Sequence, residues 1–199
     1  MNNMDNNNVH PHNIIFLDID GVLLIDSDGK KNSNKFMAER AFINEKIPED
    51  VLETLYLYDV GAVLNFNKGA VARLHTLIEK TDAKIVVSSD WRLGKTVEKL
   101  KWLLSLHDLD KYIIDKTGEE KNAFDRKANI RAWLKANQSL VKNFVIIDDL
   151  WFNGLDRKFP DNFVLTQTHF TEEDLEKALA ILLRKPVKIS AVCEKDNDA

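Results

Sequence analysis

Residues 14–23 read IIFLDIDGVL, an apolar run of strand length that ends in two carboxylates one residue apart. Two carboxylates at the end of a buried strand repel each other and lose hydration unless a cation or hydrogen-bond donors compensate them. Asp18 and Asp20 therefore indicate a metal site or an active site, and Gly21 permits a tight turn directly after them. An isolated Asp-x-Asp is more often an Asp-rich turn, so the interpretation depends on the rest of the chain.

Three more polar segments follow in order along the sequence: SSDWR at 88–92, DRK at 125–127 and DD at 148–149. The first and the last of them come directly after strand-like apolar runs. In open parallel α/β sheets the ligand crevice lies just outside the carboxyl ends of the strands. We therefore expect these groups to converge although they are far apart in sequence.

The composition is that of a folded globular protein. A chain of 199 residues fits one domain with a modest insertion, and 44% hydrophobic and 30% charged residues are ordinary for a soluble protein. A net charge of −4 disfavours non-specific nucleic-acid binding, although a local basic patch stays open. The single cysteine, Cys193, cannot form an internal disulfide, and its polar surroundings argue against a catalytic thiol.

The first twelve residues are rich in Asn and lack the basic and then apolar pattern of a signal peptide. We interpret 1–12 as a disordered leader. No apolar run is long enough to span a bilayer, so we expect a cytoplasmic protein without membrane contact, with signal-less export left open.

Strand-like and helical patterns alternate along the chain. Strands are predicted at 14–17, 84–87, 112–114, 143–147 and 162–165. Helices are predicted over 68–80, 97–104 and 128–134 and after Thr171, which is suited to an N-cap. This alternation predicts an α/β fold, a Rossmann-like parallel sheet of about five strands with helices on both faces.

Residues 13–184 are expected to form a single domain with two interruptions. Leu23 to Ile25 and the turn at 26–29 resemble a hairpin flap beside the first Asp pair, because Asp-Gly is a strong turn signal. Residues 30–67 predict a small cap insertion with one short helix near 49–58. After Pro186 the tail, 185–199, is expected to be flexible.

The ordered polar segments resemble the four motifs of the haloacid dehalogenase (HAD) superfamily of phosphohydrolases. The resemblance rests on Asp18-Ile19-Asp20-Gly21, the strand-terminal Ser88, a basic residue near Arg126 and the pair Asp148-Asp149. Residues 88–92 and the stretch from Arg126 through Ile130 to Leu134 are similar, more narrowly, to the HAD-like domains associated with RNA-repair proteins.

This resemblance implies roles for the acidic residues. Asp18 would be the nucleophile that forms an aspartyl phosphate, and Asp20 would protonate the leaving group and later activate water. Mg²⁺ is the implied cofactor, because the site offers hard oxygen ligands. Its implied ligands are the Asp18 carboxylate, the Asp20 backbone carbonyl and Asp149, while Asp148 would orient the basic residue or a metal-bound water.

The resemblance also implies a phosphate-binding set. Ser88 and Ser89 would donate hydrogen bonds to the phosphoryl group, and Arg126 or the adjacent Lys127 would add positive charge. Arg92 is either a substrate contact or part of a structural ion pair. For the aromatic side chains Trp91, Trp151 and Phe152, core packing is favoured over stacking on a nucleobase.

The leading hypothesis is a Mg²⁺-dependent phosphomonoesterase that acts on nucleotide or polynucleotide-end phosphates. A small cap leaves an exposed crevice that can admit the end of a bulky phosphorylated substrate. The alternatives are a phosphatase of phosphoproteins or small metabolites and a non-catalytic binding or regulatory domain with the same fold. The sequence makes no prediction of oligomeric state.

Overall fold

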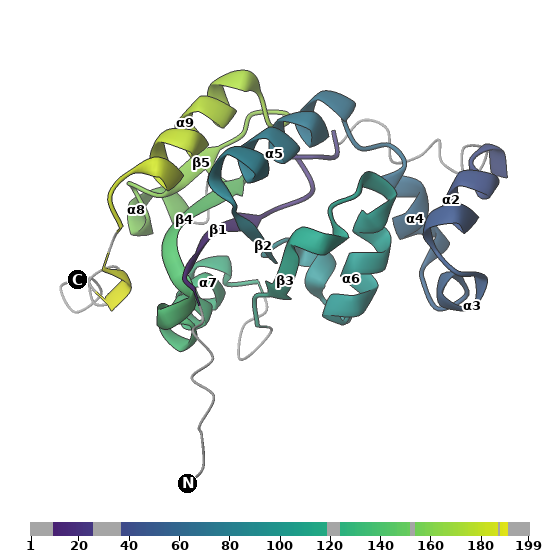
Figure 1. Ribbon diagram of the computed structural model, residues 1–199, viewed down its shortest axis with the longest axis horizontal. Coiled ribbons are helices and arrows are strands. Elements are labelled where there is room, and N and C mark those ends of the chain that lie inside the picture. The colour runs from purple at the N-terminus through teal and green to yellow at the C-terminus, as the bar shows by residue number, and fades with distance from the viewer. Residues whose placement is uncertain (1–9, 26–36, 119–123, 152–153, 187, 191–199) are drawn as a thin grey trace, which may run out of the picture.

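A five-stranded parallel sheet forms the centre of the computed structural model, which describes residues 10–25, 37–118, 124–151, 154–186 and 188–190 (Figure 1). The strands lie in the order β3-β2-β1-β4-β5, and their bounds are β1 His12–Leu17, β2 Lys84–Val87, β3 Ile113–Lys116, β4 Val141–Asp148 and β5 Phe163–Leu165. β1 is the central strand, since Ile15 pairs with Ile85 of β2 and with Val145 of β4. The Rossmann-like α/β fold predicted from the sequence is confirmed.

Helices cover both faces of the sheet. The main helices are α5 Lys68–Thr81, α6 Val97–Leu104, α7 Arg126–Ala136, α8 Leu155–Lys158 and α9 Glu172–Leu183. Short 3₁₀ helices connect them: η2 Asp90–Arg92, η3 Ser105–His107, η4 Asp110–Tyr112 and η5 Gln138–Leu140. Apolar residues of α5, α6 and α9 belong to one buried cluster and those of α7 and α8 to another, so the two groups lie on opposite faces.

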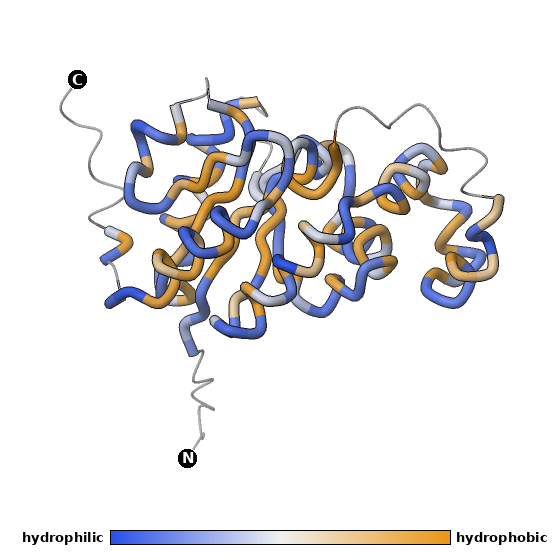
Figure 2. Tube along the Cα trace, turned by 90° about the horizontal axis from the view of Figure 1, so that it is seen from above, coloured by the Kyte–Doolittle hydropathy of each residue, from blue (hydrophilic) through white to orange (hydrophobic). Residues whose placement is uncertain are grey.

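The central strand explains why both faces must be covered. Ile15 and Leu17 point into the larger cluster, whereas Ile14 and Phe16 point into the smaller one, as the two-residue period of a strand requires. Phe16 makes an edge-on contact with Trp133 of α7, with ring centroids 5.4 Å apart. Figure 2 shows the hydrophobic strands inside and hydrophilic segments outside.

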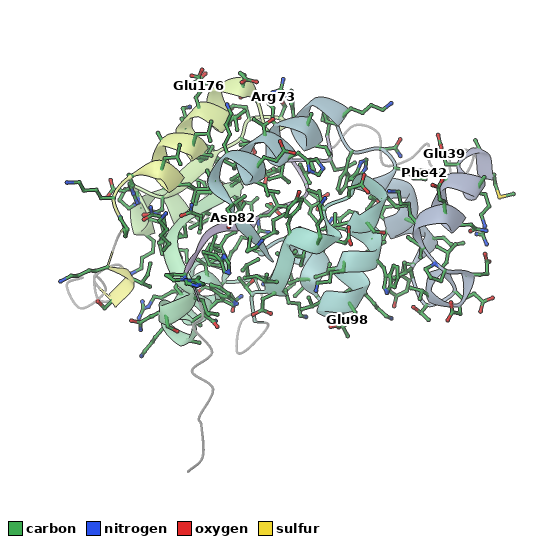
Figure 3. The ribbon with its side chains drawn as sticks, viewed as in Figure 1. Glu39, Phe42, Arg73, Asp82, Glu98 and Glu176 are labelled. Atoms are coloured by element: carbon green, nitrogen blue, oxygen red, sulfur yellow. The ribbon has the colours of Figure 1, made fainter. Side chains whose placement is uncertain are left out.

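Polar side chains fix where the helices begin. The Asn67 side chain accepts a hydrogen bond from the amide of Ala70 at the start of α5, and Asp125 accepts one from Ala128 at the start of α7. Thr171 caps α9 in a reciprocal capping box, which confirms it as the N-cap. Arg73, labelled in Figure 3, joins α5 to α9 through an ion pair with Glu172.

Three short helices with defined bounds lie in the described part of the insertion, residues 37–67, so the prediction of one helix near 49–58 is wrong. They are α2 Arg40–Lys46, α3 Glu49–Leu52 and α4 Leu57–Val63, and together they lie at one end of the molecule (Figure 1). Tyr56 has an extended backbone conformation, with φ −73° and ψ 122°, which separates α3 from α4. The apolar spacing of residues 51–56 fits a single helix equally well, so the sequence pattern alone cannot reveal this break.

Several strand boundaries differ slightly from the prediction. β2 has the predicted bounds, but Tyr112 belongs to η4, and β4 extends beyond 143–147 at both ends. Residues 1–9 of the predicted leader, the tip of the predicted hairpin at 26–29 and residues 191–199 of the predicted tail lie outside the described residues. Within the tail, Ile189 is 5% exposed and packs in the smaller cluster.

None of the helices in the described part of the chain combines the length and the apolar composition that crossing a membrane requires.

Candidate active site

Asp18 and Ser88 lie together where the central strands end. Asp18 directly follows β1, is 2% exposed, and donates its backbone N–H to the carbonyl of Ile147 in β4 at 3.0 Å. Ser88 follows β2 and donates its backbone N–H to the carbonyl of Leu17 at 3.0 Å. The parallel ladders therefore bring the carboxyl ends of β1, β2 and β4 to one edge of the sheet, as the sequence predicts.

Arg126 connects the first and the last acidic motif. Its Nη1 lies 2.6 Å from Asp18 Oδ2 and 2.5 Å from Asp148 Oδ2, and its Nη2 lies 3.3 Å from Asp90 Oδ1. Burial alone would lower the pKa of Arg126, but the carboxylates of Asp18 and Asp148 raise it above its ordinary value. The guanidinium therefore stays charged inside the site.

Asp148 is fully buried at the end of β4. One carboxylate oxygen accepts a hydrogen bond from Arg126, and the other accepts the backbone N–H of Leu150 at 2.9 Å. Burial, followed by repulsion from Asp18, raises the pKa of Asp148 to about 7. Both oxygens are engaged by the protein, which agrees with the role of orienting the basic residue.

Asp18, Asp148 and Asp149 form a cluster that fits a divalent cation. Each offers one carboxylate oxygen, and the three oxygens lie within 4.8 Å of one another. Carboxylate oxygens are hard ligands, so the residues present fit a hard divalent ion such as Mg²⁺. Whether the Asp20 carbonyl also binds the ion remains a prediction.

Gly21 makes room for this cluster. Its φ is +66°, and a Cβ atom at this position would lie 2.2 Å from Asp149 Oδ2. A contact that short cannot exist without moving one of the two groups, so only glycine allows the turn after β1 to approach Asp149 this closely.

The Ser88 hydroxyl is an orphaned polar group. The residue is 0% exposed, and its Oγ has no hydrogen-bond partner among the described residues. Burying a hydroxyl without a partner costs free energy, and such a group is often a ligand contact. Thr117, which follows β3, shares both properties, although no sequence motif marks it.

Arg92 is held inside the protein by its own segment. Its Nη1 donates to the carbonyls of Ser88 at 3.3 Å and Ser89 at 3.0 Å, and it lies 3.2 Å from Asp90 Oδ1. The side chain is 0% exposed. Of the two roles that the sequence left open, this geometry agrees with the structural ion pair.

The η2 segment also positions the second Asp of the first motif. Ser89 Oγ accepts the backbone N–H of Trp91 at 3.3 Å and so caps η2. The indole Nε1–H of Trp91 then donates to Asp20 Oδ2 at 2.9 Å. Trp91 is partly buried against Phe66, so it packs as predicted and also binds a candidate catalytic carboxylate.

Trp151 does not pack in the core. It is 71% exposed, so that prediction is wrong for this residue, and Phe152 lies outside the described residues. The chain turns directly after the acidic pair, with the Trp151 N–H donating to the carbonyl of Asp149 at 3.1 Å. This turn carries the indole outward.

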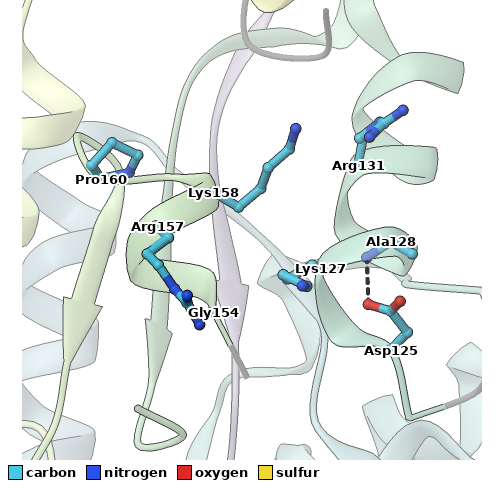
Figure 4. Close-up of a pocket in the computed structure, with 8 residues that line it drawn as sticks. All are labelled: Asp125, Lys127, Ala128, Arg131, Gly154, Arg157, Lys158 and Pro160. Atoms are coloured by element: carbon cyan, nitrogen blue, oxygen red, sulfur yellow. Dashed lines mark hydrogen bonds between the residues drawn. The ribbon is translucent and has the colours of Figure 1, made fainter. Parts of the chain in front are cut away.

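Lys127 points into a cleft between α7 and α8 (Figure 4). Its neighbour Arg126 makes the contacts to Asp18 and Asp148, so the structure distinguishes two residues between which the sequence could not choose. Three further cations line the cleft, Arg131, Arg157 and Lys158, which the sequence analysis did not identify. The cleft depends on α8, and a four-residue helix has too little periodicity to be predicted.

Comparison with known families agrees with this site. Residues 14–175 match the family described as the HAD domain in Swiss Army Knife RNA repair proteins. The chain belongs to this family. The matched residues include β1 from Ile14 onward, the strands β2 to β5 and every residue of the acidic cluster, so the HAD resemblance is confirmed. Comparison with curated proteins and with solved structures gives no match.

Proposed function

We propose that this HAD domain is a Mg²⁺-dependent phosphomonoesterase that works through an aspartyl phosphate on Asp18. The observation that carries the proposal is the guanidinium of Arg126, shared between Asp18 at 2.6 Å and Asp148 at 2.5 Å. A carboxylate that attacks a phosphate dianion meets like-charge repulsion, so positive charge beside the nucleophile is needed. The buried Ser88 hydroxyl supports the same proposal as a further donor to phosphate.

The first chemical step transfers the phosphoryl group to the protein. A carboxylate oxygen of Asp18 forms a bond to phosphorus while the bond from phosphorus to the leaving oxygen breaks. Asp20 donates a proton to that leaving oxygen, and the exposed side chain of Asp20 allows the product alcohol to depart. Arg126 and Ser88 hold the phosphoryl oxygens during the transfer.

The second step regenerates the nucleophile. Asp20, now ionised, takes a proton from a water molecule, whose oxygen attacks phosphorus. The bond from phosphorus to Asp18 breaks, and inorganic phosphate leaves. The Asp18 carboxylate is then ready for another cycle.

Asp18, Asp149 and the Asp20 backbone carbonyl would hold Mg²⁺. When bound, the ion neutralises charge that the phosphate and the nucleophile share. Asp148 orients Arg126, because its second oxygen is already engaged by the amide of Leu150.

The proposed substrates carry a phosphate at the end of a nucleotide or polynucleotide. Two observations support this class. The family description names RNA-repair proteins, and the described part of the insertion, residues 37–67, holds three short helices at one end of the molecule (Figure 1). An enclosed site would favour small metabolites, whereas an open one admits the end of a long chain.

Hydrolysis of an aryl phosphate tests the reaction class. We expect turnover that requires Mg²⁺ and falls by at least about three orders of magnitude in Asp18→Asn, the scale for removing a nucleophile. Asp82→Asn is the matched control, since it makes the same chemical change in the exposed loop between α5 and β2 (Figure 3), at the opposite end of β2 from Ser88. Turnover that ignores a chelator, or that survives Asp18→Asn, would refute the proposal.

A substrate panel tests the class of leaving group. It contains nucleotides, oligonucleotides with 3′- or 5′-terminal phosphates, phosphopeptides and sugar phosphates. The highest kcat/KM is expected for a nucleotide or oligonucleotide. If purified protein hydrolyses none of them, the domain is a binding or regulatory module instead.

A further inference from the structure

The cleft between α7 and α8 gathers positive charge beside the candidate active site. It has a volume of about 730 Å³ and is lined by eight residues, four of them cationic: Lys127, Arg131, Arg157 and Lys158. Asp125 is the single acidic residue of the lining, and its carboxylate caps α7 by accepting the N–H of Ala128. The whole chain carries a net charge of −4, so this cleft is a local exception.

Two of these cations, Lys127 and Arg157, lie beside Gly154. Lys127 Nζ and Arg157 Nη2 lie 3.6 Å and 3.8 Å from the point where a Cβ of Gly154 would stand. Within the part of the chain that the structure describes, neither side chain forms an ion pair. Like charges held this close repel each other, and an anion between them would remove the repulsion. Figure 4 shows Arg131 and Lys158 farther along the same opening, on facing helices.

Helix α7 contributes one cation to the acidic site and another to the cleft. Arg126 and Lys127 are consecutive residues of its first turn, and consecutive positions on a helix point about 100° apart. Arg126 is therefore directed at Asp18 while Lys127 is directed into the cleft. A ligand with one phosphate at Asp18 would present its next anionic groups to Lys127 and Arg157.

Two exposed aromatic side chains are close in sequence to residues of the acidic site. Phe124 is 74% exposed two residues before Arg126, and Trp151 is 71% exposed two residues after Asp149. Aromatic faces stack on nucleobases with little sequence preference, and cationic grooves follow the phosphate backbone. The combination fits a single-stranded polynucleotide better than an acidic peptide, which has no bases to stack.

We propose that the α7–α8 cleft binds the phosphodiester backbone of a single-stranded polynucleotide whose terminal phosphate occupies the Asp18 site. The position of the terminal phosphate rests on the proposed phosphomonoesterase function. Binding of the phosphodiester backbone does not depend on that function, and it can be measured without turnover. The residues that would bind it are Lys127, Arg131, Arg157 and Lys158.

The test compares two double variants that remove the same charge. Arg131→Gln/Arg157→Gln removes two cleft cations, and Lys135→Gln/Lys142→Gln removes two exposed cations outside the cleft. Fluorescence anisotropy with a labelled oligoribonucleotide carrying a terminal phosphate measures binding in an Asp18→Asn background, which keeps the ligand intact. An oligodeoxyribonucleotide of the same sequence tells RNA from DNA, and an acidic phosphopeptide represents the competing occupant.

We expect the cleft variant to bind the oligonucleotide about tenfold more weakly and the control variant to bind it unchanged. The slope of log affinity against log salt should shrink by about 0.7 for each phosphate that the cleft variant no longer neutralises. Equal affinities of the two variants, an unchanged salt slope, or tighter binding of the phosphopeptide would overturn the inference. Thermal melting of both variants excludes a folding defect as the cause.

Turnover of an aryl phosphate by the unsubstituted chain separates this inference from the proposed function. If the chain hydrolyses nothing while binding still depends on the cleft, the proposed function fails and the cleft stands. If aryl phosphate is hydrolysed while oligonucleotide binding ignores the cleft, the inference fails and the function stands.

Discussion

Trp91 Nε1 donates a hydrogen bond to Asp20 Oδ2 at 2.9 Å, across 71 residues of sequence. The indole is held in turn by Phe66, with ring centroids 6.2 Å apart, and by the capped 3₁₀ turn that begins after Ser89. Asp20 itself is exposed, and its backbone forms an isolated bridge with Leu24 directly around the turn at 21–23. Trp91 is therefore a positioning residue for the proposed acid–base group.

Trp91→Phe tests this positioning role. The variant keeps an aromatic ring but loses the N–H donor, so kcat for an aryl phosphate should fall about fivefold with KM nearly unchanged. That decrease corresponds to about 1 kcal/mol, the usual net value of one hydrogen bond. Trp102→Phe is the matched control, because it is the same substitution at a position on α6 that does not contact Asp20. Equal kinetics for both variants would show that the bond to Asp20 does not matter.

Asp20→Asn should slow both halves of the reaction. The amide can neither protonate the leaving oxygen nor take a proton from water, and loss of general acid–base catalysis reduces rates by about 10²–10⁴-fold. With a good aryl leaving group, formation of the phosphoenzyme suffers less than its breakdown. Rapid acid quenching should therefore show phosphate accumulating on Asp18. An unaltered steady-state rate would exclude Asp20 as the acid–base group.

Gly21 and Gly94 provide a test of the close approach to Asp149. Both have a left-handed backbone, with φ of +66° and +65°, but a Cβ at Gly94 would have nothing within 4 Å. Each Ala substitution adds similar strain, about 1–2 kcal/mol. The clash with Asp149 is specific to position 21.

Gly21→Ala should therefore raise the Mg²⁺ concentration needed for half-maximal activity, while Gly94→Ala should not. Titration of Mg²⁺ against turnover measures this difference, and the melting temperatures of the two variants measure the strain that they share. Equal Mg²⁺ requirements would mean that Asp149 does not bind the ion.

The sequence predicts the sheet and the acidic cluster because both depend on local patterns. Runs such as 144–147 are apolar on both sides of the strand, and a parallel sheet brings their carboxyl ends to one edge. The family resemblance then supplies roles for the residues at that edge. Strand order and residue polarity are sufficient to predict that these acidic residues lie together.

The remaining features depend on orientation and on contacts between distant segments. The choice between Arg126 and Lys127 is decided by Asp125, whose cap fixes where α7 begins and hence which residue faces Asp18. As a large aromatic residue, Trp91 is expected to pack in the core. Its hydrogen bond to Asp20 forms only because the chain around Asp20 lies beside η2. These relationships are absent from any single stretch of sequence.

The raised pKa of Asp148 predicts how stability depends on pH without metal. Its pKa is about 7 in the folded chain, against 3.8 as an ordinary carboxyl, so between these values the folded state binds more protons than the unfolded state. Stability contributed by this group is therefore lost as pH rises from about 4 to about 7. Urea unfolding at several pH values should show this loss, and Asp148→Asn, which does not titrate, should remove that component.

Mg²⁺ should reverse the loss, because a cation binds the ionised carboxylates and competes with protons. The stabilisation by Mg²⁺ should therefore be larger at pH 8 than at pH 5, and Asp149→Asn should reduce it at both. Asp82→Asn, in an exposed loop away from the cluster, should keep the full effect. If Mg²⁺ stabilises the chain equally at both pH values, the ion is not bound by the carboxylates of Asp18 and Asp149 beside Asp148.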